Sequence, residues 1–277
     1  MLNSFLIAAL LVANVDGGVA RKKPSAKQLS APRAQAEAPL DGGVLRAPAM
    51  GASTAAADAG TASVDARARV DAGTPAVKKV AMSPEVKTLV DRMQAFYEGT
   101  SDFKASFSQV YTYKLFKRTQ TSSGTVVFKK PALMRWEYEK PAKKSFVLAG
   151  DTVYAHDPEA MMLTVAGINT NQLSASVTFL WGKGKLADEF SIQRAPCAGC
   201  KGVLLELTPL MPDARFQKVK LEVDPKSAQV IKSTVIDPDG SENAITFSNL
   251  TPNTGVPADH FKMNPPEGTQ VQDFRKK

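Results

Sequence analysis

The stretch from Gly124 to Pro141 decides the fold: Gly-Thr-Val-Val-Phe-Lys-Lys-Pro-Ala-Leu-Met-Arg-Trp-Glu-Tyr-Glu-Lys-Pro. Residues 124–130 and 132–139 are two runs rich in β-branched and aromatic residues, and a proline separates them. In the second run Met134, Trp136 and Tyr138 recur at every second position, and charged residues stand between them. This alternation predicts neighbouring antiparallel strands with one large apolar face.

Similar short runs fill the rest of the chain. Turn signals such as Ala149-Gly150-Asp151 and Asp224-Pro225 separate several of them. Many short strands joined by tight turns predict an antiparallel meander rather than alternating β-α-β units. The expected strands are 103–116, 124–130, 132–139, 144–149, 152–155, 161–165, 188–194, 202–208, 215–223, 228–236 and 242–249.

Two helices are expected beside these strands. Ser83 is a good N-cap, Pro84 suits the first helical position, and Gly99 provides the stop. A second helix is predicted over 170–181 from the spacing of its apolar residues. Two helices cannot cover about eleven strands unless the sheet curls around them. The fold class is therefore mainly β with α (α+β), a strongly curved sheet with helices over its mouth and a concave apolar cavity.

Composition divides the chain into three parts. Residues 5–13 form an apolar run too short to span a membrane, and Gly18-Val19-Ala20 suits cleavage, so 1–20 are expected to be a signal peptide. A short uncleaved anchor is the alternative. Residues 21–80 lack aromatics and are rich in Ala, Pro and Gly, which predicts a disordered linker. Residues 81–277 are expected to form the folded domain.

The net charge of +8 is divided evenly. Residues 1–80 hold 10 basic and 6 acidic residues, and residues 81–277 hold 25 and 21. Neither part has the dense basic block with stacking aromatics that nucleic-acid binding requires, so no nucleic-acid partner is expected. Weak attraction to an anionic membrane surface remains open.

Arrangements for ordinary catalysis are missing from the sequence. His156 and His260 have no nucleophile partner at motif spacing, and with two cysteines they match no zinc pattern. We therefore expect no enzyme, no metal and no cofactor. Cys197-Ala-Gly-Cys200 lies between strands, so we expect a disulfide that closes a hairpin turn in an oxidising compartment. A thioredoxin-like redox pair is the alternative.

The stretch from Gly124 to Pro158 closely resembles the periplasmic outer-membrane lipoprotein carrier family, the LolA-like proteins. In the family pattern, a first strand ends in a basic residue and Pro, and Arg/Asn-Trp and a second Pro follow it. An apolar strand, Asp-Gly and an aromatic strand that closes with Asn/Asp-Pro come next. Upstream, Phe103-Lys-Ala-Ser-Phe107-Ser-Gln109 is similar to the family's Phe-x-Ala-x-Phe-x-Gln. The end, Phe261-Lys-Met-Asn-Pro-Pro-Glu-Gly-Thr-Gln-Val271, resembles its closing motif. The resemblance covers residues 83 to about 275 in order.

The resemblance implies an open, unclosed antiparallel β-barrel lidded by helices. It implies a periplasmic, monomeric carrier whose cavity takes the acyl chains of lipidated proteins. The carrier would receive them from an inner-membrane release complex and pass them to an outer-membrane acceptor. The family's basic residue before the motif proline helps to hold the lid shut through backbone hydrogen bonds, and Lys130 occupies that position. Parity and resemblance together predict the cavity and lid residues Leu89, Met93, Phe107, Phe128, Met134, Trp136, Tyr138, Tyr154, Leu173, Val177 and Trp181.

Two other functions stay open. The same domain could carry another lipid, such as a glycolipid, or could be an envelope structural protein with a filled core. Each buried CH₂ contributes about 0.8 kcal/mol, so acyl chains of ordinary length need an escort across water. An apolar cavity of this kind also agrees with the absence of a polar catalytic cluster from the sequence.

Overall fold

The computed structural model describes residues 79–168 and 184–275. The expected signal peptide, the expected linker up to residue 78 and the expected helix 170–181 lie outside the described residues. Leu173, Val177 and Trp181 therefore lie outside them as well.

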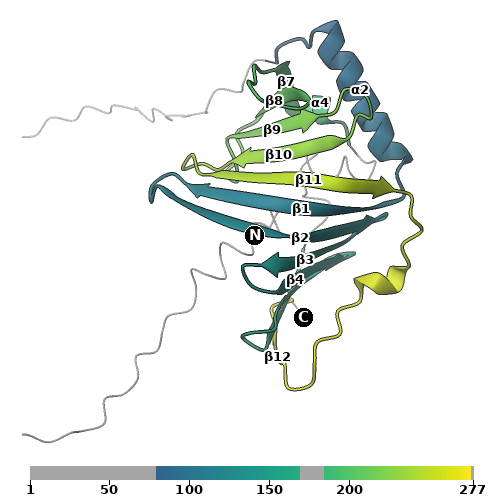
Figure 1. Ribbon diagram of the computed structural model, residues 1–277, viewed down its shortest axis with the longest axis vertical. Coiled ribbons are helices and arrows are strands. Elements are labelled where there is room, and N and C mark those ends of the chain that lie inside the picture. The colour runs from purple at the N-terminus through teal and green to yellow at the C-terminus, as the bar shows by residue number, and fades with distance from the viewer. Residues whose placement is uncertain (1–78, 169–183, 276–277) are drawn as a thin grey trace, which may run out of the picture. The chain divides into compact units, whose positions relative to one another are not determined.

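One twelve-stranded sheet contains all the described strands, in the order β12-β6-β5-β4-β3-β2-β1-β11-β10-β9-β8-β7 (Figure 1). Neighbouring strands are antiparallel, except that β12 pairs parallel with β6. Hydrogen bonds do not close the sheet between its edge strands β7 and β12, so the predicted open sheet is confirmed. The strands are β1 (Asp102–Tyr113), β2 (Arg118–Lys129), β3 (Leu133–Lys140), β4 (Lys144–Ala149), β5 (Thr152–Asp157), β6 (Met162–Gly167), β7 (Phe190–Arg194), β8 (Val203–Pro209), β9 (Lys218–Val223), β10 (Val230–Ile236), β11 (Glu242–Pro252) and β12 (Gln270–Asp273).

The second strand is longer than its sequence pattern predicts. It was expected to begin at Gly124, but β2 begins at Arg118, which pairs with Tyr113 at the end of β1. Residues 118–123 are mostly polar and carry no apolar alternation, so periodicity alone does not reveal them. They form a strand because the whole length of β1 offers them backbone partners.

Helix α2 (Pro84–Gly99) follows the sequence prediction closely. The Ser83 hydroxyl accepts a hydrogen bond from the backbone N–H of Val86 at 3.3 Å, as an N-cap should. The buried residues of α2 recur at helical spacing and form one stripe that packs into the sheet's main apolar cluster. Two shorter helices are α4 (Leu186–Glu189) and the 3₁₀ helix η3 (Ala258–Phe261). Within the described residues, no helix is long and apolar enough to cross a membrane.

Both faces of the β2–β4 region are covered. The larger cluster, here called the inner cluster, contains Phe128 and Trp136 and packs against α2. A smaller cluster, here called the outer cluster, joins Val127 and Val147 to Val256 and Phe261 from the segment around η3. Adjacent residues of β2 thus belong to opposite faces because side chains alternate along a strand.

Asp102 anchors the C-terminal segment that forms the outer cluster. Its carboxylate accepts hydrogen bonds from the N–H and hydroxyl of Thr254, at 2.7 and 2.9 Å, and from the N–H of Gly255 at 3.1 Å. Burial alone would raise the pKa of this carboxyl, but these hydrogen bonds outweigh it and the net pKa is lowered. The ionised carboxylate therefore holds the turn that leads to Val256 and η3.

Gly124 allows β2 and β3 to approach closely. A Cβ atom at this position would lie 1.8 Å from the backbone oxygen of Glu137. The register also shifts between Ser123 and Gly124, where β2 pairs with β3. Any side chain here would push the two strands apart.

We predict that Gly124→Ala destabilises the fold by about 1 to 3 kcal/mol, the usual range for overpacking a closed site. Gly99→Ala is the matched control, because a Cβ there meets nothing within 4 Å and helices favour alanine. Urea unfolding of both variants measures the difference. Equal midpoints for the two variants would contradict the close approach.

We predict that Asp102→Asn destabilises the protein by about 1 to 3 kcal/mol at neutral pH, because the hydrogen-bond donors of Thr254 and Gly255 lose a charged, buried acceptor. The lowered folded-state pKa means that this stabilisation is present above the unfolded value of about 3.9 and is lost as the pH falls through the folded value. Urea midpoints between about pH 7 and 2.5 should therefore fall less steeply in the variant. The exposed Asp188→Asn should keep the wild-type slope, and a wild-type slope for Asp102→Asn would refute the assignment.

Candidate functional site

The candidate site is the apolar face shared by α2 and the inner side of the sheet. Met93 of α2 and Phe128 of β2 are both 0% exposed, so water does not reach either. The residues that the structure brings together here are the predicted Leu89, Met93, Phe107, Phe128, Met134, Trp136 and Tyr138. The predicted Leu173, Val177 and Trp181 fall outside the described residues.

Aromatic rings dominate this face. Phe107 of β1 lies edge-on to Trp136 and Tyr138 of β3, with ring centroids 4.8 and 5.0 Å away. Phe103 stacks on Phe128 at 5.1 Å. The indole N–H of Trp136 points to the sulfur of Met134 at 3.0 Å, so the polar group of that ring finds a partner within the cluster. Rings and a flexible thioether provide apolar contact that adapts to the shape of what it touches.

A neutral polar network borders the aromatic cluster. The Tyr138 hydroxyl donates to the Gln109 side-chain oxygen at 3.0 Å, and the Gln109 amide donates to Asn243 at 2.9 Å. All three residues are buried. Burial raises the pKa of Tyr138 well above its usual value, so the phenol stays neutral and keeps its proton. The network fixes Tyr138 and provides no ionised group for chemistry.

Lys130 holds the last turn of α2. Its ammonium group donates to the backbone oxygens of Tyr97 and Glu98, each at 2.8 Å. These carbonyls belong to the C-terminal turn, where helical partners run out and a cation is favourable. Burial is the main cause of a lowered Lys130 pKa, and the charge of Glu98 opposes it. The predicted backbone hydrogen bonds of Lys130 are therefore present and reach α2.

Tyr154 lies apart from the other predicted residues. It packs against the outer cluster, and its β5 position is paired with Val147, a member of that cluster. The sequence pattern did not separate the two faces here because β5 carries only a short, weakly alternating run. We therefore leave Tyr154 out of the candidate site.

Three further residues join the inner face although no role was assigned to them. Phe103 has the same parity as Phe107 in β1, so the sequence contained a signal for it. Phe247 of β11 approaches Trp136 with centroids 6.3 Å apart, which depends on the pairing of β1 with β11. Tyr97 lies beside Phe103, and its hydroxyl accepts the N–H of Val230 at 3.2 Å. It stands at helical spacing from Val86 and Met93, on the buried stripe of α2.

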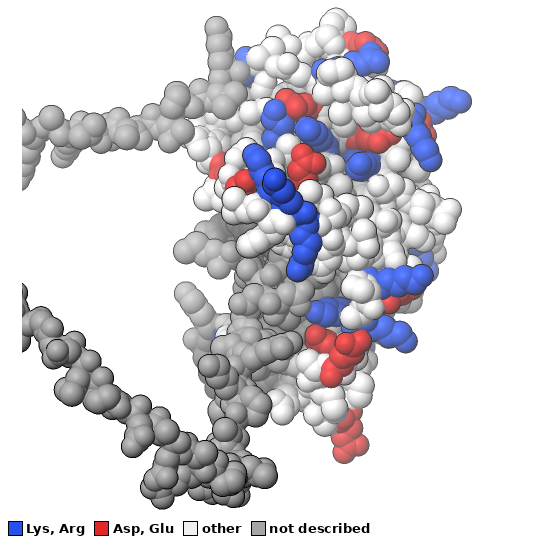
Figure 2. Space-filling model, turned by 60° about the vertical axis from the view of Figure 1, so that its left-hand side comes forward, with Lys and Arg blue, Asp and Glu red and all other residues white. Residues whose placement is uncertain are grey.

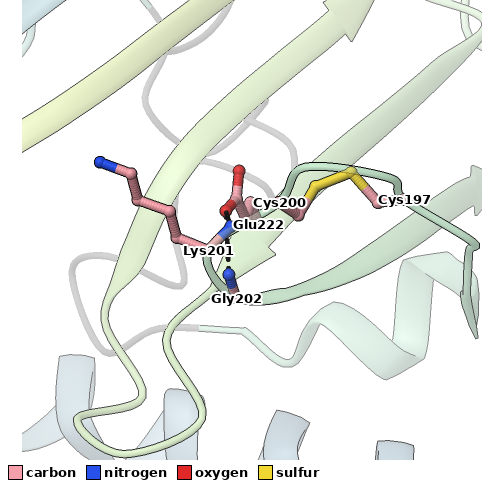
Figure 3. Close-up of a disulfide and its surroundings, with 5 residues drawn as sticks. All are labelled: Cys197, Cys200, Lys201, Gly202 and Glu222. Atoms are coloured by element: carbon pink, nitrogen blue, oxygen red, sulfur yellow. Dashed lines mark hydrogen bonds between the residues drawn. A yellow bond between two sulfur atoms is a disulfide. The ribbon is translucent and has the colours of Figure 1, made fainter.

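The cysteine pair stands away from this face, in the turn between β7 and β8. Cys197 and Cys200 form a disulfide with Cα atoms 5.6 Å apart. Glu222 of β9 reaches the same turn and accepts the N–H groups of Lys201 and Gly202, at 2.6 and 3.0 Å (Figure 3). The disulfide and the carboxylate together hold the turn, in agreement with a structural bridge.

Comparison with known proteins agrees with this geometry. The model of the family "Outer membrane lipoprotein carrier protein LolA" matches residues 98–264. The outer-membrane lipoprotein carrier protein of Dechloromonas aromatica is 31% identical over 183 residues, which cover 66% of this chain and 86% of that protein. The carrier protein of Cupriavidus pinatubonensis is 28% identical over 194 residues, covering 69% and 90%.

A solved structure from Thermus thermophilus is similar at 12% identity and a TM-score of 0.46, covering 68% of this chain and 98% of that one. That likeness is too remote to bear on function. The family match spans β1 to β11, which is most of the sheet. The chain belongs to the LolA family of outer membrane lipoprotein carrier proteins.

Proposed function

We propose that this protein is a non-enzymatic periplasmic carrier of lipidated proteins. It binds their acyl chains between α2 and the inner face of the sheet and transfers them from the inner membrane to the outer membrane. The observation that carries the proposal is the aromatic, uncharged inner cluster, in a chain whose curated relatives are named lipoprotein carriers.

Acyl chains enter by taking the place of side chains that pack against one another in the inner cluster. Met93, Phe128 and Trp136 are closed off from water, so α2 has to shift before a ligand reaches them. Each methylene that is then buried contributes about 0.8 kcal/mol, which compensates for the packing that the separated side chains give up. Because both states are apolar, the exchange needs no ionisable group.

Lys130 is proposed to control this opening. It joins β2 to the end of α2 through two charge-assisted hydrogen bonds. Farther along the helix, Arg92 makes exposed hydrogen bonds to the backbone oxygens of Pro225 and Lys226, where water can readily replace them. Lys130 is thus a latch at one end of the helix, and the carrier opens when its two bonds break.

The remaining parts of the proposal follow the family. A signal peptide exports the chain, residues 21–80 tether the folded domain, and the carrier acts as a monomer. An inner-membrane release complex loads it, and an outer-membrane acceptor receives the cargo. No cofactor takes part.

We predict that a p-benzoyl-phenylalanine in place of Trp136 cross-links to lipidated proteins through their acyl chains in the native envelope. The same replacement at Tyr154 is the control, because this residue lies on the opposite face in the outer cluster. Mass spectrometry identifies what is attached. Recovery of a free glycolipid alone would assign the domain to another lipid, and no adduct in a stable sample would favour a structural protein with a filled core.

We predict that Lys130→Met weakens the attachment of α2 by about 1 to 2 kcal/mol, the range for partly exposed hydrogen bonds to a charged group. Amides in the last turn of α2 should exchange faster with deuterium, and an apolar fluorophore should bind faster. Lys130→Arg should restore both rates. Lys129→Met is the control at the adjacent position, and an equal effect there would show that Lys130 is not the latch.

A further inference from the structure

The hairpin between β1 and β2 projects from the sheet. Residues 118–122 of β2 pair with β1, but β3 begins to pair with β2 only at Ser123. The end of the hairpin therefore extends past the neighbouring β3–β4 turn, as Figure 1 shows. We call residues 114–118, Lys-Leu-Phe-Lys-Arg, the β1–β2 tip.

Two large apolar side chains stand at this tip. Leu115 is 75% exposed and Phe116 is 77% exposed, more than any other large hydrophobic residue that the structure describes. They are adjacent in a turn closed by a hydrogen bond from the Lys117 N–H to the Lys114 oxygen at 3.4 Å. Two large apolar side chains that are exposed on a projecting turn do not stabilise the fold of a domain in water. The pair therefore indicates contact with an apolar phase or partner.

Basic and aromatic residues surround the pair. Lys114, Lys117 and Arg118 flank it, and the Arg118 guanidinium lies over the Tyr113 ring at 5.3 Å. The Tyr113 and Phe116 rings meet edge-on at 6.4 Å. Apolar side chains framed by Lys, Arg and Tyr are the composition of segments that lie in a membrane interface. Figure 2 shows Lys and Arg side chains on the face that the view brings forward, with Asp and Glu side chains among them.

Two acidic residues at the base of the hairpin, Asp237 and Asp239, have hydrogen-bond partners. Asp237 accepts the Tyr111 hydroxyl at 2.5 Å, and Asp239 accepts the hydroxyl of Ser241 at 2.9 Å. Lys114 lies against Gly240 in the same β10–β11 turn, where its charge is one of the smaller contributions that lower the pKa of Asp239. Lys117 and Arg118 remain as the outward positive charges beside Leu115 and Phe116.

We propose that the β1–β2 tip docks the protein on an anionic lipid bilayer, with Leu115 and Phe116 in the interface and Lys117 and Arg118 on the headgroups. The bilayer is favoured over a protein partner because the apolar surface is a small projecting point with positive charge around it. A protein partner would be expected to need a broader surface. The inference goes beyond the carrier function and does not depend on which cargo is carried.

The test is flotation of the full chain with vesicles of phosphatidylethanolamine and phosphatidylglycerol. Leu115→Ser combined with Phe116→Ser should weaken binding at least about tenfold, because two buried apolar side chains are lost. Phe274→Ser is the matched control: Phe274 is 66% exposed but follows β12 at the opposite end of the strands, so binding should not change. Equal binding by the double variant and the wild type would overturn the proposal.

Charge is tested separately. Lys117→Gln and Arg118→Gln should each weaken binding about fivefold, since each basic residue near an anionic surface contributes roughly that factor. High salt should weaken binding as well. Equal binding to neutral phosphatidylcholine vesicles would refute the role of the anionic headgroups.

A probe at the tip locates the contact. The chain's only two cysteines form the disulfide, so Phe116→Cys can carry a single nitrobenzoxadiazole dye. Its fluorescence should rise and shift to the blue on addition of the anionic vesicles, whereas the dye at Phe274→Cys should not respond. An unchanged signal at position 116 on addition of the anionic vesicles would overturn the proposal. Cargo cross-linking at position 136 is read independently, so a failure here is distinguishable from a failure of the carrier function.

Discussion

The burial of the inner face of the sheet beneath α2 is the interaction on which the rest of the structure depends. Side chains alternate along β2 and β3, so Phe128 and Trp136 point to α2 while their neighbours point away. A helix covers such a face only along one stripe. The buried stripe of α2 provides this cover. The contact between α2 and the sheet is both the core of the domain and the proposed place of the cargo.

In the proposed carrier the same interface serves as core and as binding site, so its strength has to be limited. Aromatic and thioether contacts around Trp136 and Met134 are apolar and adaptable, so they can be exchanged for acyl chains. The polar attachment of α2 is concentrated in few places, Lys130 among them. The outer face is held differently, since Asp102 fixes the turn that brings η3 over Val127 and Val147. Opening can therefore occur on one face while the other keeps the sheet together.

The two ends of the strands also differ in character. One end carries the last turn of α2 and its contact with Lys130. The other carries the β1–β2 tip, where Leu115 and Phe116 face outward among basic residues. In a carrier that works between two membranes, the apolar β1–β2 tip would bring the protein to a bilayer without exposing the inner face of the sheet.

The sequence by itself determined what depends on local chemistry. Alternation predicted β3, the Ser83 cap, Pro84 and Gly99 predicted α2, and the order of motifs predicted the family. Most of the inner cluster also followed from parity, because a strand with Met134, Trp136 and Tyr138 on one side has to bury that side. What only the tertiary structure decided depends on which strands pair and in which register. β1 extended β2 to Arg118, the pairing of β5 with β4 carried Tyr154 to the outer face, and β11 brought Phe247 to Trp136. The partner and register of a strand leave no periodic signal within the strand itself, which is why those residues could be placed only in the folded sheet.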